Sequence, residues 1–156
     1  MMKTLKMMFE ENNAKQLTDA LELGLKNNNE SPFFAGKVTP LVEAIFSVVV
    51  PLKEQGLLFN PEGKKIEYFN FEEFLQWTDL VSLKNLYFTI KESNEKGNLT
   101  RVQFDGSHYK SINLEILSDY IKRYNIHLEF EEEDFPIAHY NLHTGVASVI
   151  KELVLS

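Results

Sequence analysis

The chain has 156 residues, of which 44% are hydrophobic, and this size suits one globular domain with a core of its own. Its 23 acidic residues outnumber its 16 basic residues and give a formal net charge of -7, so the average field opposes direct binding to nucleic acid or to an anionic membrane. The chain contains no cysteine, which excludes disulfides, thiolate metal sites and a thiol nucleophile, and which favours a reducing, cytoplasmic location.

The first part of the chain carries apolar residues at three- and four-residue spacing. This spacing predicts one or two amphipathic helices before the polar stretch NNNESP. The residues that form the pattern are Leu5, Met8, Phe9, Leu17, Ala20, Leu21 and Leu25.

The most apolar stretch, LVEAIFSVVVPL, predicts a central buried helix because it is apolar on nearly every side. Thr39 followed by Pro40 predicts the start of this helix, since threonine can cap free amides and proline suits the first helical turn. Gly56 predicts its end. The stretch carries Glu43 and is shorter than the roughly 18 to 20 apolar residues of a membrane-spanning helix, so we predict no membrane span in this chain.

Three further elements follow in the middle of the chain. The turn sequence NPEG between two short apolar runs predicts a small β-hairpin. Asn70 with Glu73 three residues later matches a relaxed capping box and predicts the short helix FEEFLQW. A longer helix that ends at Gly97 is predicted by an apolar stripe, formed by Leu83, Leu86, Tyr87 and Ile90.

The last third of the chain predicts two helices joined by the stretch IHLEFEEED, residues 126–134, as an extended linker or a strand. The first helix is indicated by Leu114, Leu117, Ile121 and Tyr124. Asp134 and Pro136 signal the start of the second, whose apolar stripe is Ile137, Tyr140, Val146, Val149, Ile150 and Leu153. We therefore predict a mainly α fold: a single all-α domain over residues 1–156, built as a compact bundle of about six to seven helices with one short β-hairpin.

Two histidines, His139 and His143, stand four apart on the predicted final helix, a spacing that puts two imidazoles on one face and can hold zinc. A carboxylate from the nearby EEED run could complete the ligand set of a metal-dependent hydrolase. However, Tyr140 occupies the position where metalloproteases of this pattern carry the general base, and the pair lies beside the apolar stripe. We therefore expect no metal and no cofactor, and we keep the hydrolase as a weaker alternative.

An acidic run precedes the final helix, and it admits two interpretations. Carboxylates are favoured near the positive end of a helix dipole, which needs no function. Alternatively, the run is a docking patch that steers a basic protein segment. On the second interpretation the predicted partner-binding residues are Glu129, Glu131, Glu132, Glu133, Asp134, His139 and His143.

The order of segments resembles the all-α domain of the coupling ATPases of type IV secretion and conjugation systems. The resemblance runs from about Leu17 to Leu153 and lies in hydrophobic pattern: an aromatic residue after a loop, a buried helix with an EA step, a charged end, a glycine and a short helix. The matching residues are Phe33-Phe34, Glu43-Ala44, Lys53-Glu54, Gly56 and Phe71 to Trp77. The terminal NLHTGVASVIKEL is similar to the helix by which that domain returns to its parent.

The resemblance implies a domain excised from a membrane-anchored, hexameric ATPase, where it lies at the cytoplasmic mouth of the ring and recognises secretion cargo or an adaptor protein. The chain lacks the GxxxxGK, GxGxxG and GxSxG patterns, so we expect no catalysis of its own. Its acidity favours a protein partner over DNA. The alternative within the same class is a free-standing helical secretion chaperone or adaptor, which would be encoded as a complete gene of this size.

Overall fold

A computed structural model describes residues 32–124 and 137–155, together with residues 15, 17, 19, 20 and 128. These residues contain no strand and form a mainly α fold, which confirms the predicted class. Five helices are described in full, against the six to seven predicted for the whole chain. They are α3 (Pro32–Glu54), α4 (Phe71–Trp77), α5 (Leu80–Lys96), α6 (Glu115–Lys122) and α7 (Ile137–Leu155).

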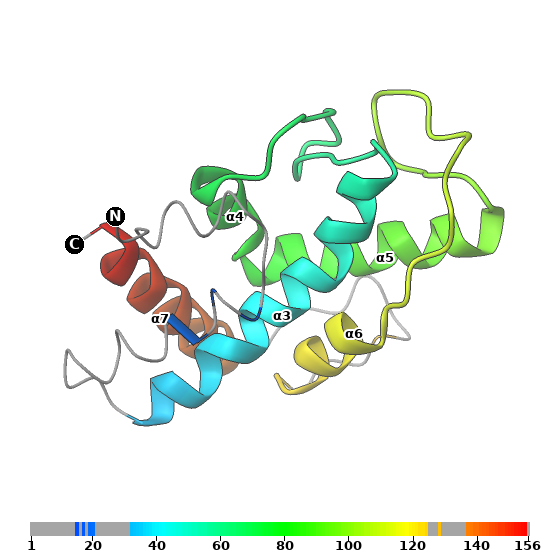
Figure 1. Cartoon of the computed structure of the whole chain (residues 1–156). Coiled ribbons are helices and arrows are strands. Elements are labelled where there is room, and N and C mark those ends of the chain that lie inside the picture. The colour runs from blue at the N-terminus through cyan, green and yellow to red at the C-terminus, as the bar shows by residue number, and fades with distance from the viewer. Residues whose placement is uncertain are drawn as a thin grey trace.

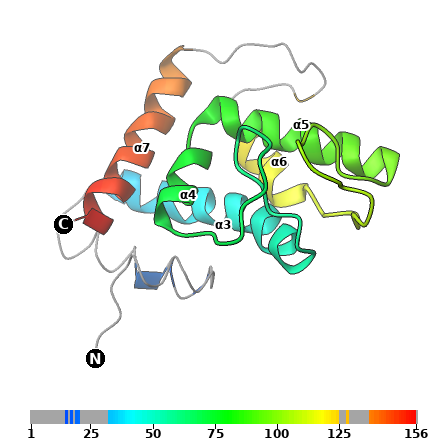
Figure 2. The ribbon, with the colours of Figure 1, turned by 90° about the horizontal axis from the view of Figure 1, so that it is seen from above.

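Helix α3 crosses the centre of the molecule, and α6 and α7 pack against it (Figure 1). Helix α5 contacts α4, α6 and α7 (Figure 2), and the short α4 joins the bundle through α5 and through the ring contact of Phe74 with Phe46 of α3. None of the helices among the described residues is long and apolar enough to span a membrane.

The start of α3 differs from its prediction. The helix begins at Pro32, so Thr39 is not its N-cap and Pro40 lies inside it. An internal proline removes one helical hydrogen bond. Val38, two positions before Pro40, and Leu41, directly after it, are both fully buried, and this packing stabilises the helix across the missing bond.

The end of α3 agrees with its prediction, because the chain turns at Gly56. Gly56 has a φ of 71° and donates its amide to the carbonyl of Lys53 at 3.0 Å. The next amide, that of Leu57, donates to the carbonyl of Leu52 at 2.9 Å. These two bonds form a Schellman motif, which satisfies the last carbonyls of the helix.

Helix α3 is the core helix that the sequence predicts, with one difference. Ala44, Ile45 and Val49 are no more than 1% exposed. However, an exposed or half-exposed stripe runs along the helix at spacings of four, three and four residues, and it consists of Glu43, Ser47, Val50 and Glu54. The helix therefore has a narrow face toward solvent, although none was expected.

Capping residues mark the start of α4 and both ends of α5. The side chain of Asn70 accepts a hydrogen bond from the Glu73 amide at 3.0 Å, which confirms the cap of α4. Asp79 caps α5 by accepting from the Ser82 amide at 3.2 Å. Gly97 ends α5, as predicted, with a φ of 76°. Local capping thus fixes the bounds of both helices.

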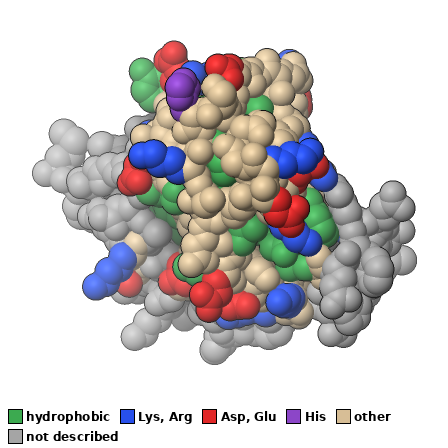
Figure 3. Space-filling view, turned by 90° about the vertical axis from the view of Figure 1, so that its right-hand side faces the viewer, with side chains coloured by type: hydrophobic (Ala, Val, Ile, Leu, Met, Phe, Trp, Pro, Cys, Tyr) green, Lys and Arg blue, Asp and Glu red, His purple; other side chains and the backbone are tan. Residues whose placement is uncertain are grey.

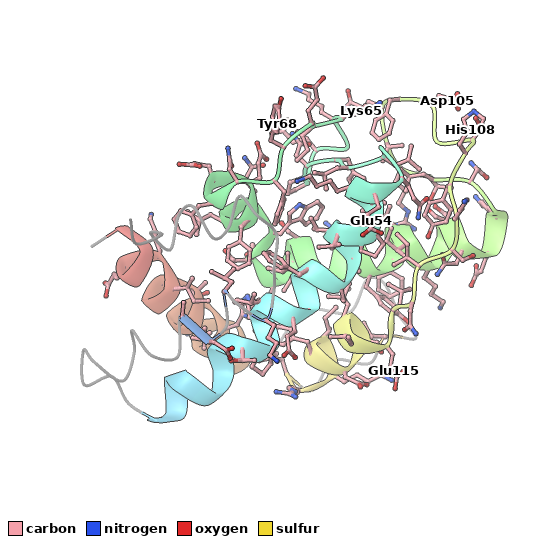
Figure 4. All side chains as sticks on the ribbon, viewed as in Figure 1. Glu54, Lys65, Tyr68, Asp105, His108 and Glu115 are labelled. Atoms are coloured by element: carbon pink, nitrogen blue, oxygen red, sulfur yellow. The ribbon has the colours of Figure 1, made fainter. Side chains whose placement is uncertain are left out.

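The predicted hairpin is reduced to a tight turn. Among the described residues, its only β-bridge pairs Phe59 with Lys65. The loop that follows the C-terminal end of α5 holds the turn in place. Its residue Gln103 donates its backbone amide to the carbonyl of Gly63 at 2.8 Å. A Cβ on Gly63 would lie 2.9 Å from the carbonyl oxygen of Arg101. Figure 4 labels Lys65 of the turn and Asp105 and His108 of the loop, which lie at the same end of the molecule.

Glu92 joins this loop to α5. Its Oε2 accepts from the Thr100 hydroxyl at 2.7 Å and from Nε of Arg101 at 3.1 Å, while its Oε1 lies 3.3 Å from Nζ of Lys96. The hydrogen bonds from Thr100 and Arg101 hold the pKa of Glu92 at about 2, below its ordinary value of 4.5. The carboxylate therefore stays charged over a wide pH range and fixes the loop to the helix.

Candidate functional site

The predicted acidic patch (Glu129, Glu131, Glu132, Glu133 and Asp134) lies outside the described residues, so its role stays a prediction. Helix α7 begins at Ile137, close to the start that Asp134 and Pro136 predict. The backbone of His139 belongs to the first turn of this helix, and its side chain lies outside the described part of the structure.

His143 lies in the core, with 1% of its surface exposed. This position corrects the prediction that it sits beside the apolar stripe and contacts a partner. Positions 143, 146 and 150 are spaced by three and four residues, and Val146 and Ile150 are fully buried as well. His143 therefore belongs to the apolar stripe itself, because this spacing places the three side chains on one face of α7.

Both ring nitrogens of His143 have hydrogen-bond partners. The hydroxyl of Tyr120 on α6 lies 2.8 Å from Nδ1, and the carbonyl oxygen of Thr78, between α4 and α5, bonds to Nε2. A carbonyl can only accept, so Nε2 carries the proton and Nδ1 accepts from Tyr120. The hydroxyl of Tyr124 lies 3.2 Å from that of Tyr120. Each group therefore donates a hydrogen bond to the next: Tyr124 to Tyr120, Tyr120 to Nδ1 of His143, and Nε2 of His143 to the Thr78 carbonyl.

Burial sets the charge state of this chain of hydrogen bonds. It lowers the pKa of His143 below the ordinary 6.5, against the opposing effects of the Thr78 carbonyl and the Asp79 carboxylate. Burial likewise raises the pKa values of Tyr120 and Tyr124. All three groups are therefore neutral near neutral pH. Because both nitrogens of His143 are engaged within the protein, neither is presented to a metal ion.

The part of the chain that the structure describes contains no group of three or more histidine, cysteine, aspartate or glutamate residues that could hold a metal ion. One imidazole of the predicted two-histidine site, that of His143, lies in the core, where its ring centroid is 5.8 Å from that of Tyr120 and 5.5 Å from that of Tyr124. The histidine spacing therefore reflects packing of α7 at position 143.

A groove of about 290 Å³ separates the junction of α4 and α5 from α7. Thr78 and Asp79 line one wall, and Leu75 lies beside them. The other wall belongs to α7, where Ala147 lies beside a polar stripe with spacings of four and three residues, formed by Thr144, Ser148 and Lys151. Thr78 belongs both to this groove and to the hydrogen-bond chain, so His143 lies directly behind the groove wall.

No single stretch of the sequence indicates this groove, because its walls come from two distant segments, residues 75–79 and 144–151. A second hollow, of about 310 Å³, was missed for the same reason, and it is lined by Lys53, Tyr68, Phe69 and Asn70. Tyr68 is 73% exposed there, which is unusual for an aromatic side chain of its size. A partial signal exists for the groove alone, since the polar Thr144, Ser148 and Lys151 repeat at helical spacing.

The charges on the described surface are mixed in sign. In Figure 3, acidic and basic side chains alternate over the face that is shown, and neither sign forms a continuous patch there. An electrostatic footprint for a nucleic-acid backbone would be a basic stripe. This face has none among its described residues.

Comparisons with protein families, with curated proteins and with solved structures found no match to this chain.

Proposed function

We propose that the chain is a protein-recognition domain, the all-α domain of a type IV secretion coupling ATPase, which binds secretion cargo or an adaptor and has no catalysis of its own. One observation carries the proposal: several residues of the resemblance lie on α3, at its C-terminal turn and on α4, in the order that the resemblance implies. Ala44 is buried in the central helix α3, Gly56 ends that helix, and Phe71 and Trp77 bound the short α4.

The aromatic content of α4 explains why such a short helix is ordered. Phe74 contacts Phe46 of α3 edge-on, with ring centroids 6.1 Å apart, and stacks on Phe71 at 6.4 Å. Trp77 contacts Phe59 at 5.8 Å. The acidic-aromatic segment of the resemblance thus packs its rings inward, which supports a structural reading of that segment and leaves recognition to other surfaces.

Charge favours a protein partner with basic character. The net charge is -7, and five carboxylates stand within residues 129–134, immediately before α7. Such a cluster raises the encounter rate with a basic segment by long-range attraction, and it repels DNA. On this proposal the acidic run steers the partner toward the surface of α7, where Ser148 and Lys151 line the groove.

The proposal is tested by association kinetics between the domain and a basic cargo tail or adaptor from the same secretion system, with DNA as the control ligand. Reversal of Glu131, Glu132, Glu133 and Asp134 to lysine should slow association by at least about tenfold, and raising the salt concentration should slow the unmodified domain in the same direction.

A matched control reverses four exposed acidic residues elsewhere, which changes the net charge equally. These are Glu54, Glu95, Glu115 and Asp119. The control variant should associate faster than the variant in the 131–134 run, since the effect depends on where the charges lie. Tight, salt-sensitive binding to DNA, or equal effects of the two reversals on cargo binding, would contradict the proposal.

The parent protein gives a separate test of the coupling-ATPase assignment. A reading frame that continues into ATP-binding motifs outside this chain is expected, because the motifs are missing here. A gene that encodes only these residues would instead favour the free-standing chaperone, and it would leave the binding experiment meaningful.

A further inference from the structure

His143 connects three helical elements inside the core, and from this geometry we infer that it is an acid-sensitive latch that holds α7 against α6 and the α4–α5 junction. The ring belongs to α7, its Nδ1 accepts from Tyr120 on α6, and its Nε2 donates to the carbonyl of Thr78. The latch residues are 23 and 65 positions apart in sequence, so these bonds form only when the helices are packed. The inference does not depend on the proposed function.

No other buried polar residue in the described structure can act in this way. The buried polar and charged residues are Thr78, Lys84, Thr89, Ser93 and His143. Among these side-chain types, only histidine changes charge in the range of about pH 5 to 8 without a large perturbation. Among the buried residues that the structure describes, His143 is therefore the one through which a fall in pH over that range acts on the packing of α7.

Protonation disturbs the network at a defined atom. The proton adds to Nδ1, which then has to donate, yet the hydroxyl of Tyr120 already directs its own proton at Nδ1. Tyr120 can accept only if its hydroxyl turns and donates to Tyr124, at 3.2 Å. The hydrogen-bond chain must reverse, and a positive charge must remain in the core.

The surroundings of the ring favour the neutral form. Asp79 at the α4–α5 junction attracts the charged ring, but burial outweighs this attraction and lowers the pKa of His143. Other charged groups on the elements packed against α7 include Arg123, just after α6, which acts on Tyr120, and the buried Lys84 of α5. They also include the exposed Glu43 of α3 and the exposed Glu115, Asp119 and Lys122 of α6. A charged His143 is unfavourable in the core, and movement of α7 away from its neighbours would expose the ring to water and remove this desolvation penalty.

Opening of the latch would also change the groove. Thr78 and Asp79 form the wall on one side of it, while Thr144, Ser148 and Lys151 of α7 form the other. When α7 moves away from Thr78, the two walls separate. Acid thus exposes a surface that is narrow at neutral pH.

The sign of the pH effect follows from the direction of the shift. The pKa of His143 is lower in the folded state than the ordinary 6.5, so the unfolded or opened state binds more protons below that value. The contact is fully favourable above about pH 6.5, and it weakens as the pH falls from there toward the folded-state pKa.

The experiment is amide hydrogen exchange followed by mass spectrometry from about pH 7.5 to about pH 5, corrected for the intrinsic pH dependence of exchange. We expect exchange in α7 to rise several-fold below about pH 6.5 while exchange in α3 and α5 stays protected. The single tryptophan, Trp77, precedes Thr78 directly, so its fluorescence gives an independent reading of the same event.

Three variants make the result specific. His143→Gln keeps a donor and an acceptor but does not titrate, so its α7 exchange should be flat with pH. His108→Gln, which changes an exposed histidine, should behave like the unmodified protein. Asp79→Asn keeps the α5 cap and removes the carboxylate, so the acid midpoint should move to lower pH.

Two results would overturn the inference. One is an unchanged acid response of α7 in His143→Gln. The other is opening of α7 only together with α3 and α5, which would mean global unfolding. If His143→Gln does not fold, the direction of the midpoint shift in Asp79→Asn decides, since a group with only a packing role would show no shift.

Discussion

The hydroxyl of Tyr120 lies 2.8 Å from Nδ1 of His143, and this contact joins α6 to α7 across 23 positions of sequence. Both residues are buried, with 3% and 1% of their surfaces exposed. Removal of only one partner of a buried hydrogen bond is costly, because the other partner's polar atom then stays buried without a hydrogen bond. The packing of the C-terminal helix therefore depends on a polar contact as well as on its apolar stripe.

Tyr120→Phe removes the donor and leaves Nδ1 of His143 unpaired. We expect the free energy of unfolding to fall by about 1 to 3 kcal/mol, measured by urea denaturation at neutral pH. Tyr68→Phe is the matched control, since its ring is 73% exposed and its loss of a hydroxyl should change stability little. Equal stability of Tyr120→Phe and the unmodified protein would show that the contact is not formed in solution.

Val49→Asp places a carboxylate on the buried face of α3, where Val49 is 1% exposed. An unpaired charge there costs several kcal/mol, which is of the order of the whole stability of an ordinary domain, so the variant should lack a cooperative thermal transition. Val81→Asp introduces the same side chain at a position 46% exposed in the first turn of α5 and should melt normally. A normal melt of Val49→Asp would contradict the central position of α3.

Gly63→Ala should destabilise the protein more than Gly56→Ala. Both glycines have positive φ values, 81° and 71°, so each substitution costs roughly 1 to 2 kcal/mol of backbone strain. At Gly63 the added Cβ also meets the carbonyl oxygen of Arg101 at 2.9 Å, whereas nothing lies within 4 Å at Gly56. Denaturant midpoints of the two variants check this order, and a larger loss at Gly56 would mean that the turn and the loop do not touch.

Glu92→Gln tests the attachment of the loop to α5 through its pH dependence. The pKa of Glu92 is about 2 in the folded protein and near 4.5 otherwise, so its contribution is present above about pH 4.5 and is lost as the pH falls toward 2. The unmodified protein should therefore lose more stability than Glu92→Gln between neutral pH and about pH 3. Glu95→Gln, at an exposed position of the same helix, is the control. A carboxyl titration of Glu92 by NMR near its ordinary pKa would contradict the assignment.

Sequence reasoning succeeded where the deciding interactions are local. The short helix α4 starts at Asn70 and α5 ends at Gly97, as predicted, because a cap is set by a few neighbouring residues. It failed at the start of α3, where Pro40 fits a helix start locally. Burial of Val38 and Leu41 extends the helix through that proline, and no local pattern reports such packing.

The site was harder to predict than the fold. A stripe of apolar residues alone places His143 beside it, although the spacing of His143 to Val146 and Ile150 is that of a core position. The partners of its ring, Tyr120 and Thr78, are 23 and 65 positions away, and pairing at such separations has no signature in one sequence. The groove combines the same distant segments.

The narrow solvent-facing stripe of α3 offers a practical route to watching this molecule in motion. Because the chain contains no cysteine, a single Glu43→Cys or Glu54→Cys substitution would create a unique thiol on the central helix. A dye attached there would be anchored to the part of the bundle that is most deeply packed, while Trp77 serves as a native energy donor beside the α4–α5 junction. The rigid core helix thus provides its own fixed reference point for optical measurement of how the surrounding helices shift.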